Sequence, residues 1–163
     1  MSVNKRRTHV FVLPEDDANR QIANGFIVEP LPLNQQVQVL RPAGGWLKVL
    51  KRFKKDQVVG MNRYPARLMI LLIDFDDHPD RLAEAKAEIP DRLAERVFIL
   101  GALSTPEALK MANLGSYTEI GRALAKDCRQ GTETVWGHHL LQHNRPELQR
   151  LLQHVRPILF PSN

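Results

Sequence analysis

The run Leu68–Ile73, with the sequence LMILLI, is apolar at every position rather than at alternate ones. A strand with this pattern is buried on both faces, which is typical of a central strand in a parallel sheet. The acidic segment Asp74-Phe75-Asp76-Asp77 follows the run directly. The pair of features therefore constrains the fold class and also indicates where charged chemistry is expected.

Other segments alternate between strand and helix patterns. We predict strands at Thr8–Leu13, Val37–Leu40 and Val97–Leu103, and helices at Ala18–Phe26, Trp46–Lys55, Pro79–Ile89, Tyr117–Arg129 and from Asn144, as N-cap, to about Val155. Ser104 or Thr105 is expected to cap a further helix that begins with Pro106. This alternation predicts an α/β fold with a parallel-rich central sheet and helices on both faces.

The length of 163 residues fits one domain. We expect residues 1–7 to form a flexible basic end and residues 8–160 to form the domain, with a helical extension from about residue 117. No run is long enough to cross a membrane, and the first residues do not resemble a signal peptide. The single cysteine, Cys128, fits a reducing compartment. A cytoplasmic protein without a membrane anchor is therefore expected.

The formal net charge of +5 is compatible with a polyanionic partner. Basic residues collect on the outer face of the helix predicted at Trp46–Lys55, at Lys48, Lys51, Arg52 and Lys55. These side chains are candidate contacts for a nucleic-acid backbone, since such contacts add affinity through counterion release. The alternative is that they form an ordinary solvated helix face.

Acidic residues follow three of the predicted strands. Glu15 follows the first, Asp74 and Asp76 follow LMILLI, and Glu107 follows the last. Ligands of parallel sheets bind outside the carboxyl ends of the strands, and hard divalent cations prefer oxygen ligands. We therefore predict a Mg²⁺ or Mn²⁺ site formed by Glu15, Asp74 and Asp76, with Glu107 assisting. The alternative is a solvated turn that caps the next helix, a role expected of Asp77 in either case.

A Glu after the first strand and an Asp-x-Asp after the third resemble the TOPRIM domain of topoisomerases, DnaG-type primases and overcoming-lysogenization-defect nucleases. The segment Leu103-Ser-Thr-Pro-Glu107 looks like the motif that adds a carboxylate in the nuclease branch. The resemblance covers roughly residues 8–110 and implies a TOPRIM/Rossmann-like sheet. The chain departs from the pattern at Asp16, where the family commonly has Gly, and at Asn19, where it often has a second acid.

The resemblance implies a magnesium-dependent nuclease that acts on DNA or RNA phosphodiesters through Glu15, Asp74 and Asp76. Because of Asp16 and Asn19, a noncatalytic partner or regulatory module with a degenerate site, working beside a separate ATPase or DNA-binding protein, stays open. A third hypothesis is a haloacid-dehalogenase-like phosphatase with Asp74 as nucleophile and Asp76 as acid. It is disfavoured because that motif normally follows the first strand of its domain.

Overall fold

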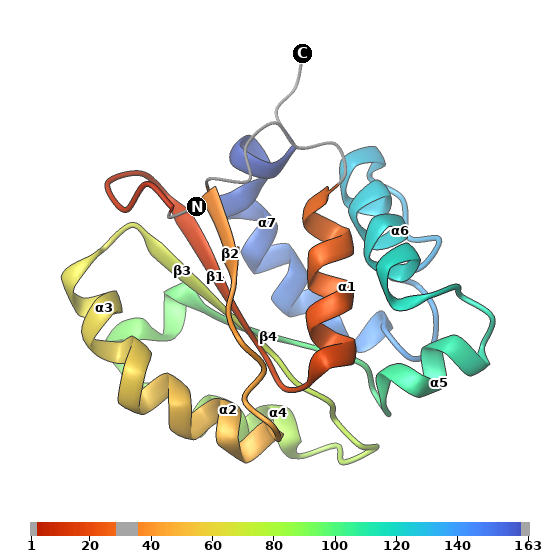
Figure 1. Cartoon of the computed structure of the whole chain (residues 1–163), viewed down its shortest axis with the longest axis horizontal. Helices are drawn as coiled ribbons and strands as arrows, with labels where there is room; N and C mark the ends of the chain where they lie inside the picture. The colour runs from red at the N-terminus through yellow and green to blue at the C-terminus, as the bar shows by residue number, and fades with distance from the viewer. Residues whose placement is uncertain (1–2, 29–35, 161–163) are drawn as a thin grey trace.

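A four-stranded, all-parallel sheet forms the centre of the protein (Figure 1). The computed structural model describes residues 3–28 and 36–160. The strands are β1 (His9–Pro14), β2 (Val37–Val39), β3 (Arg67–Leu72) and β4 (Val97–Leu100), in the spatial order β2-β1-β3-β4. In the register, Val10 of β1 lies between Val37 of β2 and Leu68 of β3. The predicted α/β class is confirmed.

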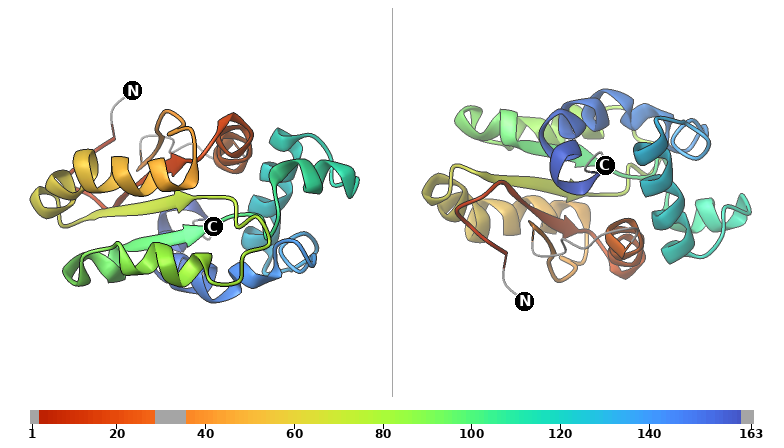
Figure 2. Two further views of the ribbon diagram at one scale, coloured as in Figure 1. Left: turned by 90° about the horizontal axis from the view of Figure 1, so that it is seen from below. Right: turned by 90° about the horizontal axis from the view of Figure 1, so that it is seen from above.

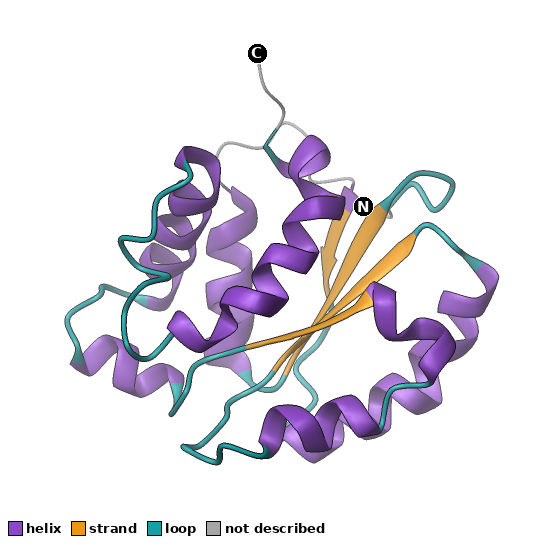
Figure 3. Cartoon of the chain, turned by 180° about the vertical axis from the view of Figure 1, so that it is seen from behind, coloured by secondary structure: helices purple, strands orange, loops and turns teal. Residues whose placement is uncertain are grey.

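Helices cover both faces of the sheet, as the views from below and above show (Figure 2). One layer contains α2 (Trp46–Arg52), a π-helical turn (Phe53–Gln57), α3 (Val58–Arg63), α4 (Arg81–Ala87) and a 3-10 turn (Asp91–Arg96). The other contains α1 (Asp17–Val28), α5 (Pro106–Met111), α6 (Tyr117–Gln130), a 3-10 turn (Gln142–Asn144) and α7 (Arg145–Leu159). Seen from behind, the sheet lies between these layers (Figure 3).

Alternating side chains of the strands divide the core into two halves. Phe11 and Leu13 of β1 pack with the α2–α4 layer, whereas Val10 and Val12 pack with the layer of α1 and α7. β3 follows the same rule, with Met69 in the first half and Leu68 in the second. Because both faces are covered, both sets of positions are apolar, which explains the unbroken LMILLI run.

Two glycines allow α1 and α6 to approach each other at backbone distance. A Cβ atom on Gly25 would lie 2.2 Å from the carbonyl oxygen of Thr118, and one on Gly121 would lie 2.1 Å from that of Ile22. Real Cβ atoms do not tolerate such distances, so this crossing requires glycine on both helices.

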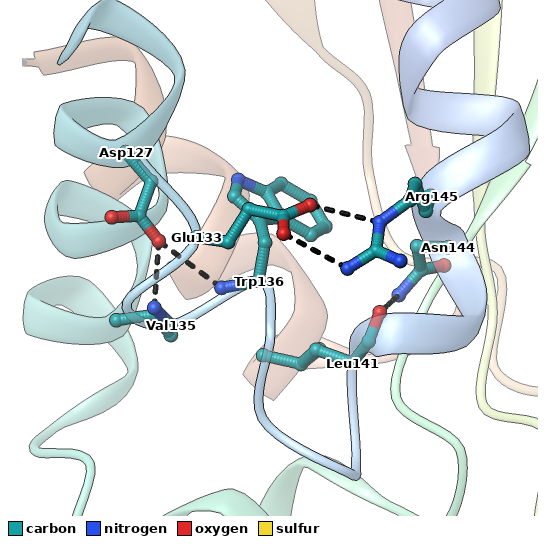
Figure 4. Close-up of polar contacts among 7 residues, drawn as sticks. All are labelled: Asp127, Glu133, Val135, Trp136, Leu141, Asn144 and Arg145. Atoms are coloured by element: carbon teal, nitrogen blue, oxygen red, sulfur yellow. Dashed lines mark hydrogen bonds and ion pairs between the residues drawn. The ribbon is translucent and has the colours of Figure 1, made fainter. Parts of the chain in front are cut away.

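Polar contacts hold the segment between α6 and α7 (Figure 4). The Asp127 carboxylate accepts hydrogen bonds from the backbone amides of Val135, at 2.6 Å, and Trp136, at 3.1 Å. Glu133 forms two bonds with Arg145, at 2.8 and 2.9 Å. These contacts order the segment that carries the chain from α6 back to the sheet.

Asn144 occupies the predicted N-cap position of α7, but its side chain bonds elsewhere. Its side chain makes no capping bond to α7, which begins at Arg145. Instead its amide donates to the carbonyls of Gly101, at 2.9 Å, and Leu141, at 3.0 Å, and accepts from the amide of Gly101 at 3.0 Å. The Asn144 side chain therefore forms the hydrogen bonds that a neighbouring strand would otherwise form with the backbone of Gly101, just after β4.

Some predicted boundaries were wrong, while one cap is confirmed. The strand predicted at Val97–Leu103 ends at Leu100, where Gly101 passes so close to Ile73 that a Cβ atom would lie 1.6 Å from its carbonyl oxygen. The helix predicted at Trp46–Lys55 continues to Arg63 through the π turn. Thr105 caps α5 and accepts from the amide of Ala108.

Within the described residues, no helix is long and apolar enough to span a membrane.

Candidate acidic site at the strand ends

The acidic site lies at the carboxyl ends of β1 and β3, after which the chain continues to opposite faces of the sheet. The chain leaves β1 through α1 on one face and leaves β3 through α4 on the other, and these two strands are neighbours in the sheet. Such a switch point opens a crevice at the carboxyl ends of the strands, which is where parallel α/β sheets bind ligands. Glu15 directly follows β1, and Asp74 follows β3 after one intervening residue, Ile73.

The structure brings Glu15 and Asp74 together through the backbone. The amide of Glu15 donates to the carbonyl of Leu72 at 2.8 Å, which continues the pairing of β1 with β3. The amide of Asp74 donates to Oε2 of Glu15 at 2.6 Å. The two residues that the sequence placed at separate strand ends are therefore in direct contact.

Asp74 is the most enclosed acid of the group, with 5 % of its surface exposed. Its Oδ1 accepts a hydrogen bond from Nδ2 of the buried Asn19 at 2.9 Å. Asp16, in turn, accepts from the amide of Asn19 at 2.9 Å and so caps the first turn of α1. At the two positions that depart from the TOPRIM pattern, the chain thus has a helix cap and a donor to Asp74.

Burial is the main cause that raises the pKa of Asp74 to about 7. The Asn19 hydrogen bond opposes this rise, and the charges of Glu15, Asp16 and Asp76 add to it. The pKa of Glu15 is also raised, mainly by burial, although the Asp74 amide and the Arg81 charge act in the opposite direction. A cation in this crevice would favour the ionised carboxylates and remove that penalty.

Asp76 and Asp77 form a tight turn with positive φ angles of 47° and 60°. Nη1 of Arg81 donates to Oδ2 of Asp76 at 2.5 Å and to the carbonyl oxygen of Asp74 at 2.8 Å. Asp77 is exposed, and the N-cap of α4 is Asp80, which makes no side-chain capping bond. The predicted capping role of Asp77 was therefore wrong, and helix capping does not explain the acidic segment.

Glu107 lies exposed in the first turn of α5. Its charge, with those of Asp16 and Asp74, adds to the burial that raises the pKa of Tyr117 at the start of α6. This places Glu107 and Tyr117 at the same end of the sheet as the crevice. In residues 3–28 and 36–160, Glu107 makes no hydrogen bond to Glu15, Asp74 or Asp76.

As the side chains stand, no three His, Cys, Asp or Glu residues in the described part of the chain are grouped to hold a metal ion. One oxygen of Glu15 is bonded to the Asp74 amide, and one oxygen of Asp76 is bonded to Arg81. The donor set is nevertheless suited to a hard cation, since it consists of carboxylates at a partly desolvated switch point. Asp76 could offer both of its oxygens to a cation only if Arg81 released it.

The predicted basic residues do not share one environment. Lys48, Lys51 and Lys55 are exposed, whereas Arg52 donates to the carbonyls of Arg41 and Pro42, both at 3.0 Å. The side chain of Lys48 passes over Gly44, whose amide donates to the carbonyl of Glu15 at 2.7 Å. Lys51 and Lys55 line a shallow groove between α2 and α4.

Arg81 is the site residue that sequence reasoning missed. Its guanidinium carbon lies 4.4 Å from the ring centroid of Trp46, the first residue of α2. A signal was available, because a cation in the first turn of a helix is unfavourable against the helix dipole unless an anion compensates it. The acids just before α4 are that compensation.

An apolar cavity of about 100 Å³ separates α1 and α7 over the sheet, and Asn19 and Asn144 are the polar residues in its wall. Both amides are already hydrogen-bonded, to Asp74 and Gly101 respectively. The polar atoms of this wall therefore have partners, and Asn19 links the wall of the cavity to Asp74.

No model of a known protein family matches the chain, and neither a curated protein nor a solved structure matches it.

Proposed function

We propose that this chain is a Mg²⁺- or Mn²⁺-dependent protein with a TOPRIM-like site that acts on nucleic-acid phosphodiesters. The observation that carries the proposal is the contact of Glu15 with Asp74 at the switch point, together with the burial that raises the pKa of both carboxyls. Clusters of acids with perturbed pKa values in a crevice are candidate functional sites. The order of the motifs, Glu after β1 and Asp-x-Asp after β3, agrees with the resemblance.

Asp74 and Asp76 would hold the ion, with Glu15 completing the donor set. When bound, the ion would supply Lewis-acid stabilisation of the negative charge that develops on the phosphate. A Glu15 carboxylate that stays outside the donor set would instead be suited to take the proton of the attacking water, because its raised pKa makes it a stronger base than an exposed carboxylate. As the water oxygen bonds to phosphorus, the phosphorus–oxygen bond to the leaving strand would break, and the leaving oxygen would take a proton from solvent.

The exposed lysines support a polyanionic substrate. Lys48 lies beside the loop that contacts Glu15, and Lys51 and Lys55 continue along the same helical segment. Lysine contacts to phosphates position a nucleic acid without reading its sequence. Arg52 is not included in this surface, because its guanidinium holds the turn before α2.

The experiment is cleavage of labelled DNA and RNA by the purified chain with and without Mn²⁺. The double variant Asp74→Ala/Asp76→Ala should lose all metal-dependent cleavage. Asp77→Asn is the matched control, since it changes an exposed acid of the same turn and should retain activity. Undiminished cleavage by the double variant would refute the assignment, and turnover of a small phosphate ester instead would favour the phosphatase hypothesis.

One observation favours the noncatalytic alternative. Asn19 and Arg81 already hold Asp74 and Asp76, so the acids have partners without an ion. In that case the chain would serve as a partner or regulatory module. Millimolar Mg²⁺ or Mn²⁺ should raise the melting temperature if the site binds metal, because a ligand of the native state stabilises it. An unchanged melting temperature would support the noncatalytic module.

A further inference from the structure

The guanidinium of Arg81 lies within the acidic site rather than on its rim. Its side chain is 8 % exposed, and its Nη1 bonds to Oδ2 of Asp76 and to the carbonyl of Asp74. Its charge also lowers the pKa of Glu15, which places it within electrostatic reach of that carboxylate. Arg81 therefore supplies positive charge where the acids would otherwise face one another.

Arg81 is held incompletely. Its Nε is buried and has no hydrogen-bond partner in the described structure. The face of Trp46 supports the guanidinium through a cation–π contact, with Cζ 4.4 Å from the ring centroid. A buried donor without a partner carries a desolvation cost, so the docked position is less favourable than that of a fully bonded arginine.

We propose that Arg81 is a built-in counterion that occupies the cation position at Asp76, and that a divalent ion binds only when the guanidinium leaves. This inference rests on the proposed function, since it concerns the same acids. Oδ2 of Asp76 accepts from Nη1 at 2.5 Å and cannot coordinate an ion through the same lone pair. A dication and a guanidinium beside one carboxylate would also repel each other, and Arg81 itself is nearly buried.

Exchange of the Arg81 guanidinium for a divalent ion would give the same acids two states. In one state Arg81 neutralises Asp76 and stacks on Trp46. In the other the ion is held by Asp74, Asp76 and Glu15, and the Trp46 ring has lost its cationic neighbour. The emission of Trp46 should therefore report the exchange in the unmodified protein.

The test combines calorimetry of Mn²⁺ binding with the fluorescence of the full chain during Mg²⁺ addition. Arg81→Met keeps an unbranched chain against Trp46 but removes the charge, and Arg81→Lys keeps the charge. We expect Arg81→Met to bind Mn²⁺ at least about tenfold more tightly than the wild type, and Arg81→Lys to remain closer to it. Mg²⁺ should change the emission of the wild type, and Trp46→Phe should abolish that change.

The outcomes separate the inference from the proposed function. Equal or weaker Mn²⁺ binding by Arg81→Met, or metal saturation without a change in Trp46 emission, would overturn the counterion inference alone. Binding by Arg81→Met but not by the wild type would support it. Absence of binding in both proteins would overturn the metal-dependent function and this inference with it. The fluorescence experiment requires no substitution at Arg81, so it holds even if that variant fails to fold.

Discussion

Replacing Asp74 with Asn should stabilise the fold at alkaline pH in the absence of metal. The Asp74 carboxyl has a pKa of about 7 in the fold against an ordinary value of 3.8, mainly because it is buried. A raised pKa means that the folded chain holds its proton more tightly than the unfolded chain. The stability that protonated Asp74 contributes to the fold is therefore fully present below the ordinary pKa of 3.8 and is lost as the pH rises through about 7.

The size of the effect follows from the same difference. Between about pH 5 and about pH 8, ionisation of Asp74 in the fold costs on the order of 3 kcal/mol. Asn keeps the shape of the side chain, accepts from Asn19 and cannot ionise. The advantage of Asp74→Asn over the wild type should therefore grow by roughly 3 kcal/mol over this pH interval, and relaxation around the charge would reduce the figure.

The assay is urea unfolding of both proteins in a metal chelator at the two pH values. Asp77→Asn is the matched control, because Asp77 is exposed in the same turn and should show no pH-dependent gain. Such a gain in stability on substitution is expected where a residue is retained for function at a cost in stability. If Asp74→Asn were no more stable than the wild type at about pH 8, the reasoning on buried charge would be refuted.

Three further predictions concern the scaffold. Gly121→Ala should destabilise the fold by about 2–3 kcal/mol, because its Cβ would meet the Ile22 carbonyl of α1; Arg122→Ala on the exposed face is the control in urea unfolding. Asn144→Ala should cost about 2–3 kcal/mol, since the Gly101 amide and carbonyl lose their partner, whereas Gln142→Ala should be near neutral. Burial lowers the pKa of His9, and its Nε2 accepts a hydrogen bond from Nε of Arg67 at 3.0 Å. The stability that neutral His9 contributes to the fold is therefore present above the ordinary pKa of 6.5 and is lost as the pH falls below it. The stability difference between the wild type and His9→Gln should shrink on acidification, and a constant difference would contradict this assignment.

Much of the fold follows from sequence because its determinants are local. The LMILLI run, the Thr105–Pro106 cap and the alternation of strands with helices each reflect burial or backbone geometry within a few residues. Val37–Val39 was recognised for the same reason, although only three residues pair with β1. The secondary structure of residues whose environment depends on one short segment was therefore predictable.

The partners of the site residues were not predictable, because they depend on contacts between distant segments. Asn19 reaches Asp74 across 55 positions, and Asn144 reaches Gly101 across 43. In each case the residue type also suits a helix cap or a turn, and only the packed sheet decides between these roles. Arg81 was missed because a helix-surface arginine is common, while a buried one requires knowledge of Trp46 and the crevice.

The central claim is that a divalent cation binds at Asp74, and the most direct test is the affinity for Mn²⁺ measured by calorimetry. The account predicts that the wild type, or at least Arg81→Met, binds Mn²⁺, and that Asp74→Asn and Glu15→Gln abolish binding. Asp77→Asn should leave the affinity unchanged. Mn²⁺ binding by Asp74→Asn with the affinity of the wild type, or its absence from both the wild type and Arg81→Met, would contradict the account.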